Sequence, residues 1–103
     1  MGMNDLTSSH RKYLSGAAHR LHPVVHIGQQ GLTEHVVAQT DHMLRVHELI
    51  KVKFIDFKEQ KHTLADSLAA QCSAALVRVI GNIAIFYRPA ASAERRKYGI
   101  TFD

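Results

Sequence analysis

The chain has 103 residues, of which 46% are hydrophobic and 21% are charged, a size and composition typical of one globular domain and not of a disordered chain. No apolar run approaches the ~20 residues that span a bilayer, and the N-terminal segment lacks the apolar stretch of a secretory signal, so we expect neither feature. Thirteen Lys and Arg residues against nine Asp and Glu residues give a net charge of +4, which favours an acidic partner such as a nucleic acid.

The first part of the chain predicts a helix, a strand and a second helix. Residues 7–9 offer N-caps for a helix over about 8–19, where apolar residues recur at helical spacing. Pro23 disfavours helical backbone at the residue before it, so a short strand over 24–27 follows. Thr33 can cap the next helix, which runs to about His47.

The second part predicts a strand, a helix and a hairpin. In the strand, apolar residues alternate with Lys51 and Lys53, so the two lysines share one face. The helix carries Cys72 on its apolar stripe, and the last two strands are joined by Gly81-Asn82, a link typical of a β-hairpin. These elements span residues 49–55, 58–71, 75–80 and 83–88.

The order helix–strand–helix–strand–helix–strand–strand predicts an α/β fold with a mixed four-stranded sheet packed with helices. Helices between strands imply parallel pairing, and the final hairpin adds an antiparallel pair. We expect a single domain over residues 1–103 with its core at about 6–89. Residues 90–103 are expected to form a basic tail, with Arg95, Arg96 and Lys97, that packs little.

Two glycines, at positions 28 and 31, stand between the first strand and the second helix. Unpaired backbone N–H groups and the positive end of a helix dipole favour an anion at such a place. Glycines also let a sugar-phosphate backbone come close. A turn that needs glycine only for its backbone angles has the same pattern, so both explanations remain open. The loop lacks the ending of a P-loop and the third glycine of a dinucleotide fingerprint.

Residues with metal-binding or catalytic chemistry form no recognisable set. The eight histidines show no spacing that aims three of them at one metal ion, and the acidic residues show no paired-carboxylate pattern. Cys72 is the only cysteine, so an internal disulfide is excluded and a core position is favoured. We therefore expect that the protein is not an enzyme and that it has no metal, no other cofactor and no small-molecule substrate.

The basic residues suggest one positive surface, although a solvated face of a soluble protein explains them equally well. The cations that could together form this surface are Arg11, Lys12, Arg20, His22, Lys51, Lys53, Arg78, Arg88 and residues 95–97. Tyr13, Phe54 and Phe86 fit the core pattern, which leaves few aromatic candidates at the surface. Contact with phosphates is therefore favoured over stacking on single-stranded bases.

Three stretches of the chain carry a resemblance to a known family. They are Leu14-x-Gly16-x-Ala18-His19-x-Leu21-x-Pro23-Val24-Val25-x-Ile27-Gly28-x-x-Gly31-Leu32-Thr33, then His47-Glu48-Leu49-Ile50-Lys51-Val52-Lys53, and then Val79-Ile80-Gly81 followed by Tyr87-Arg88. Over about residues 6–89, with the motifs in order, the chain resembles the CRM domain family. More narrowly, it is similar to the stand-alone bacterial YhbY-type proteins.

The resemblance implies a fold similar to the C-terminal domain of bacterial translation initiation factor three, and binding of structured RNA. Stand-alone bacterial members associate with precursors of the large ribosomal subunit, while plant members serve in group II intron splicing. By position, residues 28–31 are the GxxG loop implicated in RNA contact, and Lys51, Lys53 and Arg88 match basic family positions. His22 stands where many relatives have Lys, and the middle of the loop is neutral where some relatives have a basic residue.

We therefore expect a cytoplasmic, monomeric RNA-binding protein that associates with ribosomal RNA or a large-subunit precursor during ribosome assembly. The alternatives are binding of another structured RNA, such as an intron or a messenger, and a protein-interaction module that docks on an acidic partner. The expected RNA-binding residues are Lys12, Arg20, His22, Gly28, Gln29, Gln30, Gly31, Lys51, Lys53 and Arg88.

Overall fold

Helix α1 (Ser8–Ala18) begins close to the start of residues 6–98, the part of the chain that the computed structural model describes. The Thr7 hydroxyl caps the helix by accepting a hydrogen bond from the His10 N–H, and the His10 ring accepts one from the Thr7 N–H. The elements that follow are β1 (Pro23–Ile27), α2 (Glu34–His47), β2 (Leu49–Phe54), the 3₁₀ helix η2 (Lys58–Gln60), α3 (Lys61–Gln71), β3 (Ala75–Ile80), β4 (Ile83–Tyr87) and the 3₁₀ helix η3 (Ala93–Arg95).

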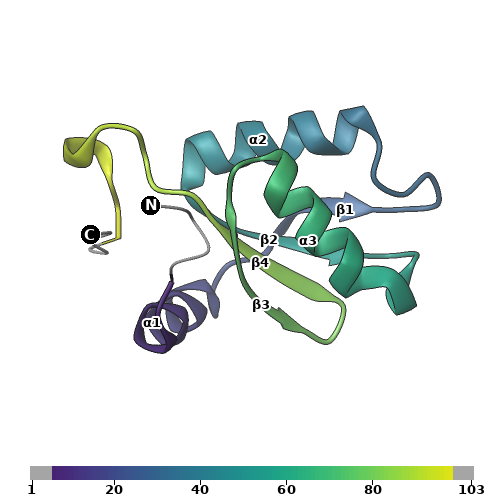
Figure 1. Cartoon of the computed structure of the whole chain (residues 1–103), viewed down its shortest axis with the longest axis horizontal. Helices are drawn as coiled ribbons and strands as arrows, with labels where there is room; N and C mark the ends of the chain where they lie inside the picture. The colour runs from purple at the N-terminus through teal and green to yellow at the C-terminus, as the bar shows by residue number, and fades with distance from the viewer. Residues whose placement is uncertain (1–5, 99–103) are drawn as a thin grey trace.

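The four strands form one sheet in the order β1–β2–β4–β3 (Figure 1). β1 and β2 run parallel, with α2 as the crossover between them, and β4 pairs antiparallel with both β2 and β3. The tight β3–β4 link is made possible by Gly81, whose φ is +57°. The predicted α/β fold with a mixed four-stranded sheet is confirmed.

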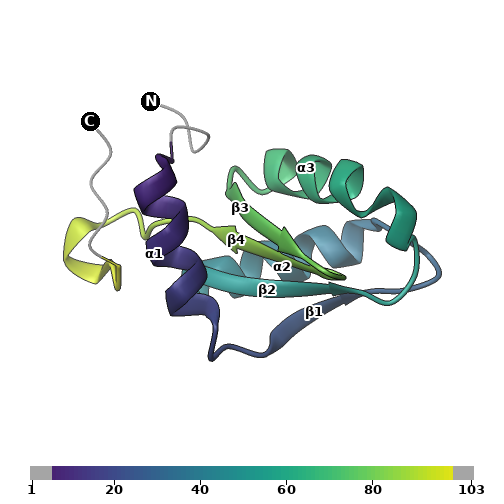
Figure 2. The same ribbon diagram turned by 90° about the horizontal axis from the view of Figure 1, so that it is seen from below.

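The helices lie in two layers, one on each face of the sheet (Figures 1 and 2). α2 and α3 cover one face, where the core includes Phe54 and Phe86. α1 packs on the other face, against residues such as Leu49 and Ile85. Cys72, at the C-terminal end of α3, is buried in this core, as its place on the apolar stripe predicts, and burial raises the pKa of its thiol.

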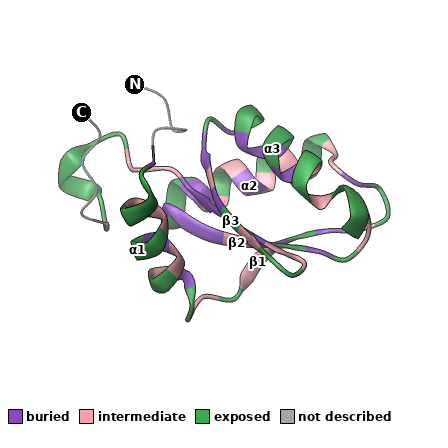
Figure 3. Cartoon of the chain, turned by 60° about the horizontal axis from the view of Figure 1, so that its bottom comes forward, coloured by how far each residue is buried: buried purple, intermediate pink, exposed green. Residues whose placement is uncertain are grey.

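α1 covers only one end of its face of the sheet (Figure 2). The core beneath it is built from the first residues of β2 and β3 and the last residues of β4, among them Ala75 and Tyr87. Toward the β3–β4 hairpin the strand residues on this face become partly or fully exposed (Figure 3). Lys53 and Ile80 are both exposed. Half of one sheet face is therefore left uncovered.

Residues 91–97, part of the tail expected to pack little, are all exposed, and contacts at Ala90, Lys97 and Tyr98 hold this segment to the domain. The buried Glu48 carboxylate accepts hydrogen bonds from the backbone N–H groups of Ala90 (3.2 Å) and Lys97 (2.8 Å). The Tyr98 ring meets the rings of Tyr13 and Tyr87 edge-on, at centroid distances of 6.4 and 6.1 Å. Residues 99–103, also assigned to the tail, lie outside the described residues.

Two further differences from the sequence prediction are local. Tyr13 fits the core pattern but is 51% exposed, because α1 presents it to Tyr98 at the margin of the sheet and not to the core. The helix predicted over 58–71 begins as η2 and continues as α3, after Phe57 takes up a left-handed backbone conformation. None of the helices within residues 6–98 is long and apolar enough to span a membrane.

Candidate functional site

The charged residues are divided unevenly among the elements. Within residues 6–98, α1 and the four strands contain no Asp or Glu. The acidic residues of this part of the chain lie on α2, α3, η2 and η3 and next to the ends of β2. They are Glu34, Asp41, Glu48, Asp56, Glu59, Asp66 and Glu94. The cations of α1 and the strands therefore have no carboxylate on their own elements to neutralise them.

A groove with a volume of about 870 Å³ runs between α1 and β3, and we call it the basic groove. Its lining residues are Arg11, Lys12, Ser15, Gly16, His19, Arg20, Val77, Arg78 and Ile80. Lys12 and Gly16 are four residues apart and lie on one side of α1, and Arg20 follows in the turn just after the helix. Lys12, Arg20 and Arg78 are exposed, and no ion pair found within residues 6–98 involves them. The groove is therefore concave and positively charged.

Two cations, Arg11 in the lining of the groove and Lys51 next to it, hold α1 in place. Arg11 Nη1 donates to the carbonyl oxygens of Leu76 (2.6 Å) and Val77 (3.0 Å) on β3. Lys51 Nζ donates to the carbonyl oxygens of His19 (3.4 Å), the C-cap of α1, and of Leu21 (3.1 Å). Lys51, expected to contact RNA, is thus half-buried and tied to the wall of the groove.

Lys53 lies on a row of partly or fully exposed residues that crosses all four strands. It is in register with His26 on β1 and with Ile83 on β4. Ile83 is in register with Ile80 on β3, which lines the basic groove. We call His26, Lys53, Ile83 and Ile80 the open row. It extends the basic groove across the half of the sheet that α1 leaves uncovered.

The glycine loop, residues 28–31, leads the chain from β1 into α2. The Gly31 N–H donates to the Gly28 carbonyl oxygen (3.0 Å), which closes a turn with Gln29 and Gln30 exposed at its centre. Within residues 6–98, the N–H groups of Gln29 and Gln30 have no acceptor. Both groups can therefore donate to an anion.

The two positions of the loop differ in whether the fold itself requires glycine there. Gly31 has a φ of +71°, and a Cβ there would lie 3.4 Å from the Phe57 ring, so the turn itself needs glycine. Gly28 is outside the left-handed region, and a Cβ there would meet no atom within 4 Å. The turn thus explains Gly31 but not Gly28, whose missing side chain leaves open space at the surface.

The glycine loop adjoins the uncovered half of the sheet. The Ile27 carbonyl oxygen accepts from the Ile55 N–H (2.9 Å), and the Phe54 N–H donates to the Asn82 carbonyl oxygen (2.8 Å). The ends of β1 and β2 and the β3–β4 hairpin therefore lie side by side (Figures 1 and 2). The glycine loop thus lies at the hairpin end of the sheet, and the basic groove lies along α1 toward the other end, with Lys53 on the uncovered half between them.

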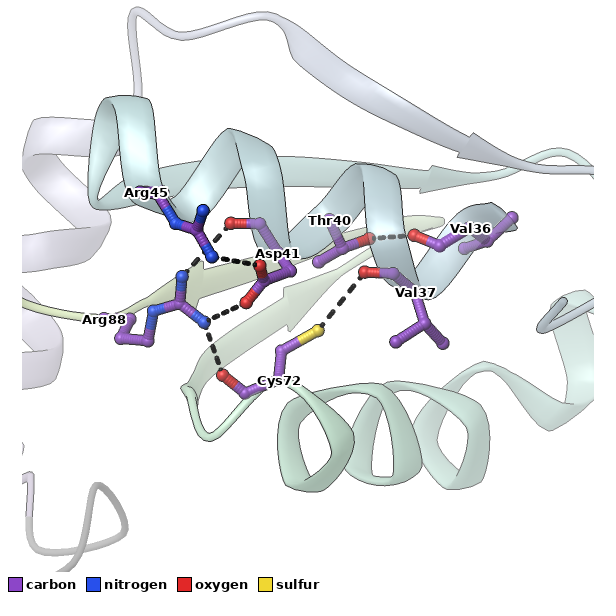
Figure 4. Close-up of polar contacts among 7 residues, drawn as sticks. All are labelled: Val36, Val37, Thr40, Asp41, Arg45, Cys72 and Arg88. Atoms are coloured by element: carbon purple, nitrogen blue, oxygen red, sulfur yellow. Dashed lines mark hydrogen bonds and ion pairs between the residues drawn. The ribbon is translucent and has the colours of Figure 1, made fainter. Parts of the chain in front are cut away.

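Arg88 lies at the opposite end of β4 from the hairpin and is engaged within the protein (Figure 4). Its Nη1 donates to Asp41 Oδ1 and to the Cys72 carbonyl oxygen, both at 2.7 Å, and its Nη2 donates to the Asp41 carbonyl oxygen at 3.1 Å. The Arg88 hydrogen bond holds the pKa of Asp41 below its ordinary value of 3.8. Arg88 thus connects the end of β4 to α2 and to the end of α3.

His22 is exposed at the start of β1, two residues after Arg20 and at the opposite end of the strand from the glycine loop. It lines a separate cavity of about 330 Å³ together with His47, Lys97 and Tyr98. Within residues 6–98, no three metal-ligating side chains come together in a group that could hold a metal ion.

Arg78 lines the basic groove but was not among the residues expected to bind RNA. Strict alternation along β3 would put it on the opposite face from Val77. The pairing of β3 with β4 is irregular between Leu76 and Arg78. This irregularity lets Val77 lie buried under α1 while Arg78 still reaches the groove on the same side.

The family model of the CRS1 / YhbY (CRM) domain matches residues 6–88. A Haemophilus influenzae protein named "RNA-binding protein" is 40% identical over 93 residues, which cover 89% of this chain and 94% of the relative. A Pseudomonas aeruginosa protein named "Probable RNA-binding protein PA4753" is 39% identical over 84 residues, 81% of each chain. The solution structure of the hypothetical protein SAV1595 from Staphylococcus aureus superposes with a TM-score of 0.76 at 32% identity and covers 89% of this chain and 97% of that one.

Replacing Asp41 by Asn tests the structural role of Arg88. Because the folded-state pKa of Asp41 is lowered, its ionised form stabilises the protein above pH ~4, and this stabilisation is lost as the pH falls through the lowered pKa. Urea unfolding should therefore show wild type more stable than Asp41→Asn at pH 7, with the difference shrinking below pH ~4. A difference that stays constant down to pH ~3 would contradict this role.

Proposed function

The chain belongs to the CRS1 / YhbY (CRM) domain family, and we propose that it binds structured RNA through the basic groove, the open row and the glycine loop. The observation that carries the proposal is the charge distribution: exposed cations gather on a concave surface built from α1 and strands, and these elements hold no carboxylate. Phosphate groups are the ligand that such a surface attracts most strongly. The relatives named for RNA binding support the same conclusion.

The contacts divide into two kinds by their chemistry. Lys12, Arg20, Lys53 and Arg78 offer point charges to phosphates, whereas Gln29 and Gln30 offer backbone N–H groups. An A-form helix hides its base edges in a deep, narrow major groove, so recognition there rests on backbone shape and phosphate contact. We leave Arg88 out of this surface because its guanidinium is bound to Asp41 and Cys72.

The proposed target is ribosomal RNA within a precursor of the large ribosomal subunit, bound by a cytoplasmic monomer. Support for this target comes from the resemblance to stand-alone bacterial YhbY-type proteins, which associate with such precursors. The protein would act by binding alone, with no reaction, cofactor or small-molecule substrate of its own. Crosslinking in cells, followed by sequencing of the attached RNA, distinguishes this target from an intron or a messenger.

The salt dependence of RNA binding tests the proposed surface, and the chain offers a matched pair of exposed arginines. Arg78 lines the basic groove, whereas Arg45 lies on α2, which packs on the other face of the sheet. Each lost phosphate contact lowers the slope of log K against log salt by about 0.9. Arg78→Ala should therefore weaken binding of an RNA hairpin and reduce the slope by about that amount, while Arg45→Ala leaves both unchanged.

Equal effects of the two arginine substitutions would contradict the proposed surface. If both variants bind the RNA hairpin as wild type does, and the same groove captures an acidic protein, the protein-interaction alternative is favoured. Thermal melting of each variant is the control, because both arginines are exposed and their removal should leave the fold intact.

Gly28→Ala tests the close approach of an RNA backbone to the glycine loop. Free protein has room for the added methyl group, so its stability should be unchanged or slightly higher. RNA affinity should fall about tenfold or more, because the methyl group keeps a phosphate from the loop N–H groups, and a hydrogen bond to a charged group contributes about 1.5–3 kcal/mol. Fluorescence anisotropy with labelled hairpin RNA measures the affinity. A stable Gly28→Ala protein with wild-type affinity would remove the loop from the interface.

A further inference from the structure

Phe57 is an aromatic residue at a position where the backbone conformation does not favour one and where the core does not need one. Its backbone is left-handed, with φ 56° and ψ 36°, a conformation that glycine and asparagine adopt easily and bulky residues rarely do. Its side chain is not placed in the core, since the residue is 42% exposed. Strained positions of this kind often lie at sites that contact a ligand.

The Phe57 ring lies against the glycine loop. Three of its carbon atoms lie 3.4–3.8 Å from the position that a Cβ of Gly31 would occupy, so the ring sits next to bare backbone. Gly31 is itself left-handed, with a φ of +71°. Two left-handed residues thus place an exposed aromatic ring beside the turn that carries Gln29 and Gln30. The next residue, Lys58, is exposed, and Asp56 and Glu59 on either side carry the opposite charge, so the ring and not net charge distinguishes this position.

We propose that Phe57 stacks on an unpaired base of the RNA whose backbone the glycine loop contacts. This inference rests on the proposed function and names its RNA class, a structured RNA with an unpaired nucleotide beside a helical segment. Bases inside a duplex are covered on both sides by their neighbours, whereas an unpaired base offers an open face to a ring. The sequence pattern placed Tyr13, Phe54 and Phe86 in the core and left few aromatic candidates at the surface. Phe57 is such a candidate, because its ring is exposed beside the glycine loop.

A tryptophan at position 57 reports directly on stacking, because the chain contains no other tryptophan. Phe57→Trp is titrated with an RNA hairpin whose loop is a non-nucleotide linker and whose stem ends in a single-stranded adenosine overhang, and with the same hairpin made blunt. The overhang hairpin should quench the fluorescence, and the blunt hairpin should not. Tyr13→Trp is the matched control, since Tyr13 is an exposed aromatic on α1 and should show no difference between the two hairpins.

Phe57→Asn removes the ring but keeps a residue that tolerates the left-handed backbone. It should bind the overhang hairpin at least about fivefold more weakly than wild type and bind the blunt hairpin equally well, whereas Phe57→Tyr should behave as wild type. Urea unfolding checks that Phe57→Asn is folded.

Quenching of Phe57→Trp by both hairpins alike, or unchanged affinity of Phe57→Asn for the overhang hairpin, would overturn the stacking role. If wild type still binds both hairpins with the expected salt dependence, the proposed function survives that result. If wild type binds neither hairpin, the proposed function fails and the stacking role fails with it.

Discussion

A four-stranded sheet has two faces to cover, and the helices of this protein cover only one of them completely. α2 and α3 pack over one face, and α1 lies across one end of the other. The remaining half-face has to be compatible with water, which explains why Lys53 and His26 stand where a covered sheet would carry apolar residues. The candidate site follows from this incomplete coverage, because the groove forms where α1 meets β3 and the uncovered half of the sheet continues from it.

The cations near the groove serve two different purposes, and their hydrogen bonds tell them apart. Arg11 and Lys51 donate to backbone carbonyl oxygens on β3 and beyond the end of α1, so they hold the helix against the sheet. Lys12, Arg20 and Arg78 extend from the same region into solvent. The first pair fixes the shape of the groove, and the second group supplies the charge that a polyanion would meet. A substitution of Lys51 would therefore alter the position of α1 as well as the charge.

Local patterns were enough to predict the elements and their order, because capping residues, Pro23 and the Gly81-Asn82 link each act over a few residues. Alternation also placed Lys51 and Lys53 on one face correctly. What the sequence could not show depends on contacts between distant residues. Asp41 engages Arg88 across 47 positions, and Glu48 binds the Lys97 N–H across 49. The irregular pairing in β3 and the left-handed Phe57 likewise escape periodicity, since both break the regular geometry on which periodicity depends.

Mapping backbone amide shifts during titration with hairpin RNA tests the central claim most directly. If the uncovered half of the sheet is the RNA-binding face, shifts should concentrate at the glycine loop, the open row and the basic groove, with Gln30, Lys53 and Arg78 among them. Exposed positions on the outer helices, such as His42 on α2 and Asp66 on α3, should not move. Shifts centred on α2 and α3, with the glycine loop and the basic groove unaffected, would contradict the account.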